Sequence, residues 1–149
     1  MLEEQWLNVL DQCGIGAFDG PVADPPGELQ TAANQFNVGK FWECHETLED
    51  VWKDTPYPFR LFYHGIIKTS VGFHHLSKHN RNGARVKLRD GVTLLKIFQP
   101  EWLGVQTDRL LADTAEWLPL LETGIIDWAK LDSQPRPRIL IADSQDTSA

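Results

Sequence analysis

Residues 41–53 read FWECHETLEDVWK, and this stretch decides the fold class. Its apolar residues recur every three to four positions, so at about 100° per residue they fall on one side of a helix. Acidic residues and Lys53 fall on the opposite side. The apolar stripe, which also includes His45, consists of Phe41, Cys44, Leu48, Val51 and Trp52. This pattern predicts an amphipathic α-helix that packs against a core.

The flanking sequence predicts further helices and no sheet. Helices are expected over residues 28–37, 59–78, 84–98 and 107–118. Pro58 is well placed to open one of them, and Pro100 stops another. A strip of small residues, Gly65, Thr69 and Gly72, would let a neighbouring helix approach closely. We therefore expect an all-α fold, a compact multi-helix bundle of stacked antiparallel hairpins with five to six helices.

The chain divides into a central core and two different ends. Residues 1–27 predict a short helix, over residues 2–12, followed by a loop rich in Gly and Pro. Residues 28–131 form the predicted helical core domain. Residues 132–149 are expected to be extended or disordered, and residues 138–141 within them could dock as an extended segment.

A weak internal repeat appears at an offset of forty residues. It pairs Phe36 with Leu76, Cys44 with Ala84, Leu48 with Leu88, and Trp52 with Val92. Such a repeat is typical of tetratricopeptide-like helical hairpins. Helical periodicity alone also generates matches of this kind, so both interpretations stay open.

Composition and charge limit the possible partners. Apolar residues make up 42% of the 149 residues, which is enough for a core without metal or disulfide staples. The net charge of −7 disfavours binding to nucleic acid or to an anionic membrane surface. The N-terminus has neither a signal-peptide pattern nor a membrane-spanning stretch. Two cysteines are too few for a disulfide framework, so we expect a cytoplasmic protein.

The stretch from Phe36 to Trp52 resembles the family catalogued as domain of unknown function 309. That family's signature runs Phe-Asn-x-Gly-x-(aromatic)-x-Glu-x-His-Glu-x-Leu-Glu-x-x-Trp. The second half of the signature matches the run from Gly65 to Lys68, His75-Leu76, Asn80 and Gly83-Ala84.

The match extends over about residues 36–95, and it departs from the family pattern at His79, where Gly is more frequent. The resemblance implies a helical bundle related to tetratricopeptide-like hairpins, often self-associating. It therefore implies a homodimer or another protein partner. It implies no activity.

His45 and Glu49 are the residues with the clearest chemical potential. They are four residues apart on one helix, so they can form an ion pair or share a metal. A structural pair is one interpretation. The other is an acid/base or metal-assisted site, hydrolase-like, with His45, Glu46, Glu49 and His75 as catalytic candidates. His45, Glu49 and His75 would then be the ligands of Zn or Fe, although no diagnostic metal-binding spacing is present.

A second set of residues predicts a binding groove. Trp42 lies at the border of the apolar stripe and is a candidate for a groove or a dimer contact. The proposed groove consists of Trp42, Tyr63, Lys68 and His74. No nucleophile motif or phosphate-binding loop is present. The leading hypothesis is thus a non-enzymatic helical interaction or binding module, and the alternative is the small enzyme.

Overall fold

The computed structural model describes residues 5, 7–8, 24–122 and 124–142. Residues 5, 7 and 8 are helical. Most of the helix predicted over residues 2–12 lies outside the described residues, as do the loop up to residue 23 and the last seven residues of the chain.

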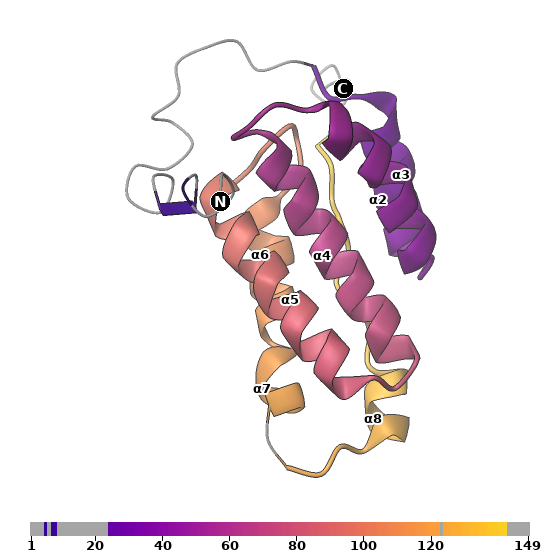
Figure 1. Cartoon of the computed structure of the whole chain (residues 1–149). Helices are drawn as coiled ribbons and strands as arrows, with labels where there is room; N and C mark the ends of the chain where they lie inside the picture. Colours follow the sequence, from indigo (N-terminus) through magenta and orange to yellow (C-terminus); the bar gives the residue numbers. More distant parts are fainter. Residues whose placement is uncertain (1–4, 6, 9–23, 123, 143–149) are drawn as a thin grey trace.

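Four long helices form the body of the protein, and this confirms the predicted all-α fold. Each runs antiparallel to the one before it (Figure 1). They are α2 (Gly27–Asn37), α3 (Phe41–Asp54), α4 (Arg60–Ser77) and α5 (Arg81–Leu95). Consecutive helices pack against one another, so α4 lies between α3 and α5.

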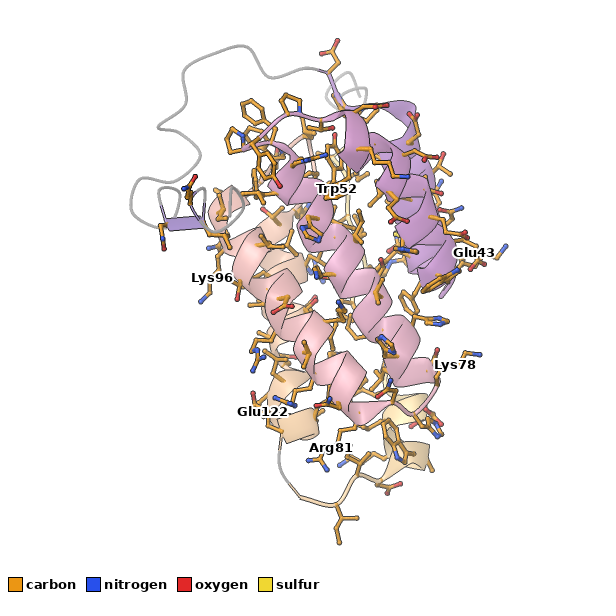
Figure 2. All side chains as sticks on the ribbon, viewed as in Figure 1. Glu43, Trp52, Lys78, Arg81, Lys96 and Glu122 are labelled. Atoms are coloured by element: carbon orange, nitrogen blue, oxygen red, sulfur yellow. The ribbon has the colours of Figure 1, made fainter. Side chains whose placement is uncertain are left out.

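Shorter elements cover the α5 side and one end of the hairpins. They are the 3₁₀ helix η2 (Lys96–Phe98) and the helices α6 (Thr107–Ala115), α7 (Leu118–Glu122) and α8 (Trp128–Ser133). Arg81 joins α5 to this end of the molecule (Figure 2), because its guanidinium donates to the carbonyls of Leu121 (2.7 Å) and Gly124 (2.9 Å). The described part of the chain has isolated β-bridges but no strand. None of the described helices combines the length and apolar character needed to cross a membrane.

An aromatic cluster forms the centre of the core. The ring of Phe73, on α4, lies 6.0 Å from that of Phe36 and 5.6 Å from that of Phe41. On its other side Phe73 meets Trp117 edge-on at 5.8 Å. All four rings are buried, so one cluster joins α2, α3 and α4 to the segment between α6 and α7.

The predicted strip of small residues lies at the α4–α5 contact. A Cβ added to Gly72 would come within 2.6 Å of the Leu88 side chain, and one added to Gly65 would meet Leu95. Gly91 makes the matching close approach from α5, against Thr69. Glycine therefore sets the separation of these two helices, as the sequence predicted.

The two hairpins α2–α3 and α4–α5 repeat at the predicted offset. Asn37 ends α2 and Ser77 ends α4, while the following helices begin at Phe41 and Arg81. Each pair is forty residues apart, which confirms the repeat in the backbone. The repeat therefore reflects more than helical periodicity, because the turns recur as well as the apolar positions.

The turns between these helices share one hydrogen-bond pattern. Gly39 (φ +85°) and His79 (φ +58°) both occupy the left-handed region. The next amide in each turn, that of Lys40 or Asn80, donates to a carbonyl five residues earlier, at 2.8 and 2.9 Å. This is the pattern of a Schellman helix end, which favours glycine at the left-handed position.

Two side-chain contacts hold His79 in this conformation. Its ring stacks on Trp128 with 4.5 Å between centroids, and its Nε2 lies 2.9 Å from Asp132 Oδ2. Both partners belong to α8. A histidine at this position therefore ties α8 to the α4–α5 turn, which a glycine could not do.

We expect His79→Ala to be less stable than His79→Gly by about 1 kcal/mol, measured by urea denaturation. Both variants lose the contacts to α8, but only alanine is destabilised by the left-handed backbone conformation, which glycine adopts without strain. The same pair of substitutions at Lys78, whose φ is −94°, should give the opposite order because alanine favours the helical region. Equal stability of the two His79 variants would contradict strain at this turn.

The segment after α8 docks against the helices in an extended conformation. The Asn37 side chain accepts from the Ile139 amide (2.7 Å) and donates to the Ile139 carbonyl (2.9 Å). Arg136 lies over the ring of Trp117 at 4.8 Å. Ile141 then bridges to Val105, so residues 138–141 dock as the sequence suggested.

Candidate functional site

His45, Glu49, Trp42 and His74 lie together between α3 and α4. His45 Nε2 is 3.2 Å from Glu49 Oε2, so the predicted pair forms. The Trp42 ring lies between two histidines, with its centroid 4.5 Å from that of His45 and 4.9 Å from that of His74. The packing of α3 on α4 brings these residues together.

Both ring nitrogens of His45 are engaged within α3. Nδ1 lies 3.2 Å from the Trp42 carbonyl oxygen, and Nε2 faces the Glu49 carboxylate. Both neighbours are hydrogen-bond acceptors, so whichever ring nitrogen carries a proton donates it to a group of α3. The His45 side chain is 15% exposed, and Glu49 covers its outer nitrogen. This geometry favours the structural interpretation of the pair.

His75 lies apart from His45 and faces α5. Its Nδ1 is 3.2 Å from Asn80 Nδ2, and a Cβ on Gly83 would meet its ring. Burial, then the charges of His74 and Lys87, lowers the His75 pKa. The described residues include no group of three His, Cys, Asp or Glu side chains placed to hold a metal. The predicted ligand set of His45, Glu49 and His75 is not brought together.

The other predicted site residues are distributed over the molecule. Trp42 and His74 meet, but Tyr63 lies at the opposite end of α4 and Lys68 lies towards α5. Lys68 lines a small cavity of about 210 Å³ with Asp90, and its charge contributes to a lowered Lys87 pKa, second to burial. Glu46 is exposed on α3. The four residues proposed as one groove therefore belong to three different places.

Cys44 offers no reactive thiol beside His45. Its side chain is fully buried and unbridged, and burial raises the pKa of the thiol to about 12. A hydrogen bond with Ser70 opposes this effect only in part. A thiol with so high a pKa is not ionised near neutral pH, so it cannot act as a nucleophile there.

We expect His45→Ala to lower the free energy of unfolding by about 1 kcal/mol in urea denaturation. The substitution removes the contact with the Trp42 carbonyl and one side of the Trp42 ring's support. Glu49→Gln should cost less, about 0.3 kcal/mol, because the Glu49 carboxylate is half-exposed. A His45→Ala variant more stable than the wild type would instead show the behaviour of a functional site.

A larger cavity lies at the other end of α3. Its volume is about 510 Å³, and it is open to solvent on one side and bordered by the start of α2, the end of α3, the start of α4 and the turn at Trp102 and Leu103. Its described lining includes three aromatic side chains and four carboxylates: Phe59, Tyr63, Trp102, Asp24, Glu28, Asp50 and Asp54. Volumes of about 300–1,000 Å³ are typical of small-molecule sites.

Tyr63 is the most buried polar side chain in this cavity. It is 4% exposed, and none of the described residues forms a hydrogen bond with its hydroxyl. Burial, and then the charge of Glu28, raises the Tyr63 pKa to about 12. The hydroxyl therefore stays protonated at neutral pH and is available to a bound group.

The carboxylates of this cavity were not among the site residues predicted from the sequence. One signal was available. Asp50 and Asp54 are four residues apart at the carboxyl end of a helix, where two negative charges repel each other and oppose the helix dipole. Trp102 and Leu103 had no such signal, because a turn without helical periodicity brings them to the cavity.

The fold and the cavity define a class, an all-α protein of repeated helical hairpins with a ligand-sized pocket at one end. Residues 29–86 match the model of a family described as Domain of unknown function (DUF309), which confirms the predicted resemblance. The matched range includes α2 from Leu29, all of α3 and α4, and the beginning of α5. The Trp102 side of the cavity lies outside it.

One relative is the Uncharacterized protein YpuF of Bacillus subtilis (strain 168). The two sequences are 32% identical over 74 residues, which cover 48% of this chain and 42% of the relative. The match thus spans less than half of that protein's length. These comparisons show a similarity to one family over part of the chain and assign no activity.

Proposed function

We propose that this protein is a helical binding module that holds a small ligand in the cavity between α2, α3, α4 and the Trp102–Leu103 turn. The cavity itself carries the proposal, because about 510 Å³ of space with aromatic walls matches the size and character of ligand sites. The helices supply part of the frame, since α2, the end of α3 and the start of α4 all contribute to the lining together with the connecting segments. Tetratricopeptide-like stacking of the hairpins is part of this proposal.

The enzyme alternative has weaker support. Neither described cavity is lined by His45, Glu49 or His75. A general acid or base needs to reach its substrate, and His45 is committed to groups of its own helix. The free, buried thiol of Cys44 fits a reducing compartment, which supports the proposal of a cytoplasmic protein.

A ligand screen by thermal shift tests the binding proposal. Compounds that occupy the cavity should raise the Tm of the wild type but not that of Val51→Phe, which places a larger side chain at the cavity wall. Val38→Phe is the matched control, because Val38 is 71% exposed and lines neither cavity. The proposal fails if no compound, whether cationic, neutral or anionic, raises the Tm of the wild type more than that of Val51→Phe.

A second candidate function is association with another copy of the chain through Trp42. Trp42 is 44% exposed, although His45 and His74 fix its ring, and the highly exposed Val38 precedes the same helix. Fixed, exposed tryptophans are frequent anchors of protein interfaces. Sedimentation equilibrium of the wild type and Trp42→Ala tests it, and a monomeric wild type would exclude it.

A further inference from the structure

The larger cavity has an unbalanced charge. Among the described residues, its lining includes the four carboxylates of Asp24, Glu28, Asp50 and Asp54 but no Lys, Arg or His. No lysine, arginine or histidine among the described residues forms an ion pair with any of the four. A concave surface with one sign of charge concentrates ligands of the opposite sign.

Two of these carboxylates occupy positions that are unfavourable for the isolated helix. Asp50 and Asp54 lie in the last turns of α3, near its negative dipole end, and are four residues apart. Lys53 is the basic residue of the last turn, but it does not line the cavity. A bound cation would relieve both the mutual repulsion and the dipole interaction.

The walls between the carboxylates are aromatic and apolar. Phe59 and Trp102 stack with 5.9 Å between centroids and 10° between planes, and Val51 and Leu103 also line the cavity. Aromatic faces attract ammonium groups, and apolar walls bury methylene chains. The combination suits a cation on a hydrocarbon chain better than a fully hydrated inorganic ion.

The Tyr63 hydroxyl offers a hydrogen-bonding position to a bound group. Tyr63 as a whole is only 4% exposed, but its hydroxyl is not one of the buried polar atoms that lack a partner, and no described residue forms a hydrogen bond with it, so the hydroxyl is open to a group in the cavity. Tyr63 lines the cavity beside Glu28. A bound N–H group could donate to the tyrosine oxygen and to the carboxylate together.

The described residues include no group of three carboxylates placed to hold a metal ion. The four carboxylates come from the segment before α2, from α2 and from the last turns of α3, so a ligand that carries more than one charge can meet more than one of them. We infer that the cavity binds alkylammonium groups, such as those of a small aliphatic diamine or polyamine. This inference rests on the proposed ligand-binding function.

Calorimetric titration of the full chain tests the inference with ligands of matched length. Cadaverine and spermidine should bind with saturation, whereas pentanediol and glutarate, the uncharged and anionic counterparts of cadaverine, should not. Amine affinity should fall as the salt concentration rises, because ions screen the carboxylates. Binding of pentanediol or glutarate as tightly as cadaverine would overturn the inference, as would the absence of saturable amine binding.

Three variants locate the site. Asp50→Asn and Asp54→Asn should each weaken cadaverine binding roughly fivefold, the effect of losing one ion pair. Tyr63→Phe should weaken binding with an unchanged Tm, because no described partner of the hydroxyl is lost. Glu43→Gln is the control, since Glu43 lies at the beginning of α3, away from Trp52 (Figure 2), and does not line the cavity. Equal losses in Glu43→Gln and the Asp variants would contradict the assigned site.

The experiment separates this inference from the proposed function. If an uncharged or anionic compound binds and Val51→Phe blocks it, the cavity is a ligand site but the ligand is not a cation. If spermidine binds more tightly than a lysine tetrapeptide, the natural ligand of the cavity is a free amine. If the tetrapeptide binds more tightly, the ligand is a lysine side chain of another protein, and the cavity still binds an alkylammonium group.

Discussion

Phe73→Ala is expected to lower the free energy of unfolding by about 3–5 kcal/mol. Phe73 is fully buried, and its ring contacts Phe36, Phe41 and Trp117. The substitution removes the apolar surface of the ring and leaves a cavity that three other aromatic rings cannot fill by small movements. The loss should appear in urea denaturation as a lower midpoint with an unchanged slope.

Val38→Ala is the control for this prediction. Val38 is 71% exposed, so the loss of its methyl groups should change stability by less than about 0.5 kcal/mol. A Phe73→Ala variant within 1 kcal/mol of the wild type, on the order of an ordinary surface effect, would mean that the aromatic cluster does not hold α4 to its neighbours.

Gly91→Ala is expected to cost about 2 kcal/mol, the typical cost of overpacking a core. A Cβ at Gly91 would collide with the Thr69 hydroxyl and would come within 3.1 Å of the Gly65 carbonyl oxygen and the Thr69 amide nitrogen. The last two are backbone atoms of α4, so α4 and α5 would have to move apart. Thr69 cannot turn away freely either, because its hydroxyl donates to the Gly65 carbonyl at 2.8 Å.

Gly27→Ala is the matched substitution in an open position. A Cβ at Gly27, the first residue of α2, meets no atom within 4 Å. Alanine there should be neutral or stabilising by up to about 1 kcal/mol, because of its better helix propensity. Thermal melts of the two variants should therefore shift in opposite directions. A stabilising Gly91→Ala would mean that the helices are not in close contact at this point.

Much of the candidate site near His45 could be predicted from local spacing. The His45–Glu49 pair follows from a separation of four residues, and the approach of Trp42 to His74 follows from antiparallel packing of α3 on α4. His75 could not be placed in this way. A rotation of about 100° from His74 turns it towards α5, and the sequence does not indicate which side of α4 each neighbouring helix covers.

The sequence by itself determined the four long helices and the end of α2, and it suggested the repeat of forty residues, whereas α8 was not predicted. These features depend on interactions between residues close in the chain, such as the apolar stripe of α3 and the left-handed turn at Gly39. Only the tertiary structure decided the cavity, because its walls come from four separate segments around Asp24, Asp54, Tyr63 and Trp102. Local periodicity fixes how a helix faces its core, but the space left where several helix ends and a turn meet depends on how all of them pack together.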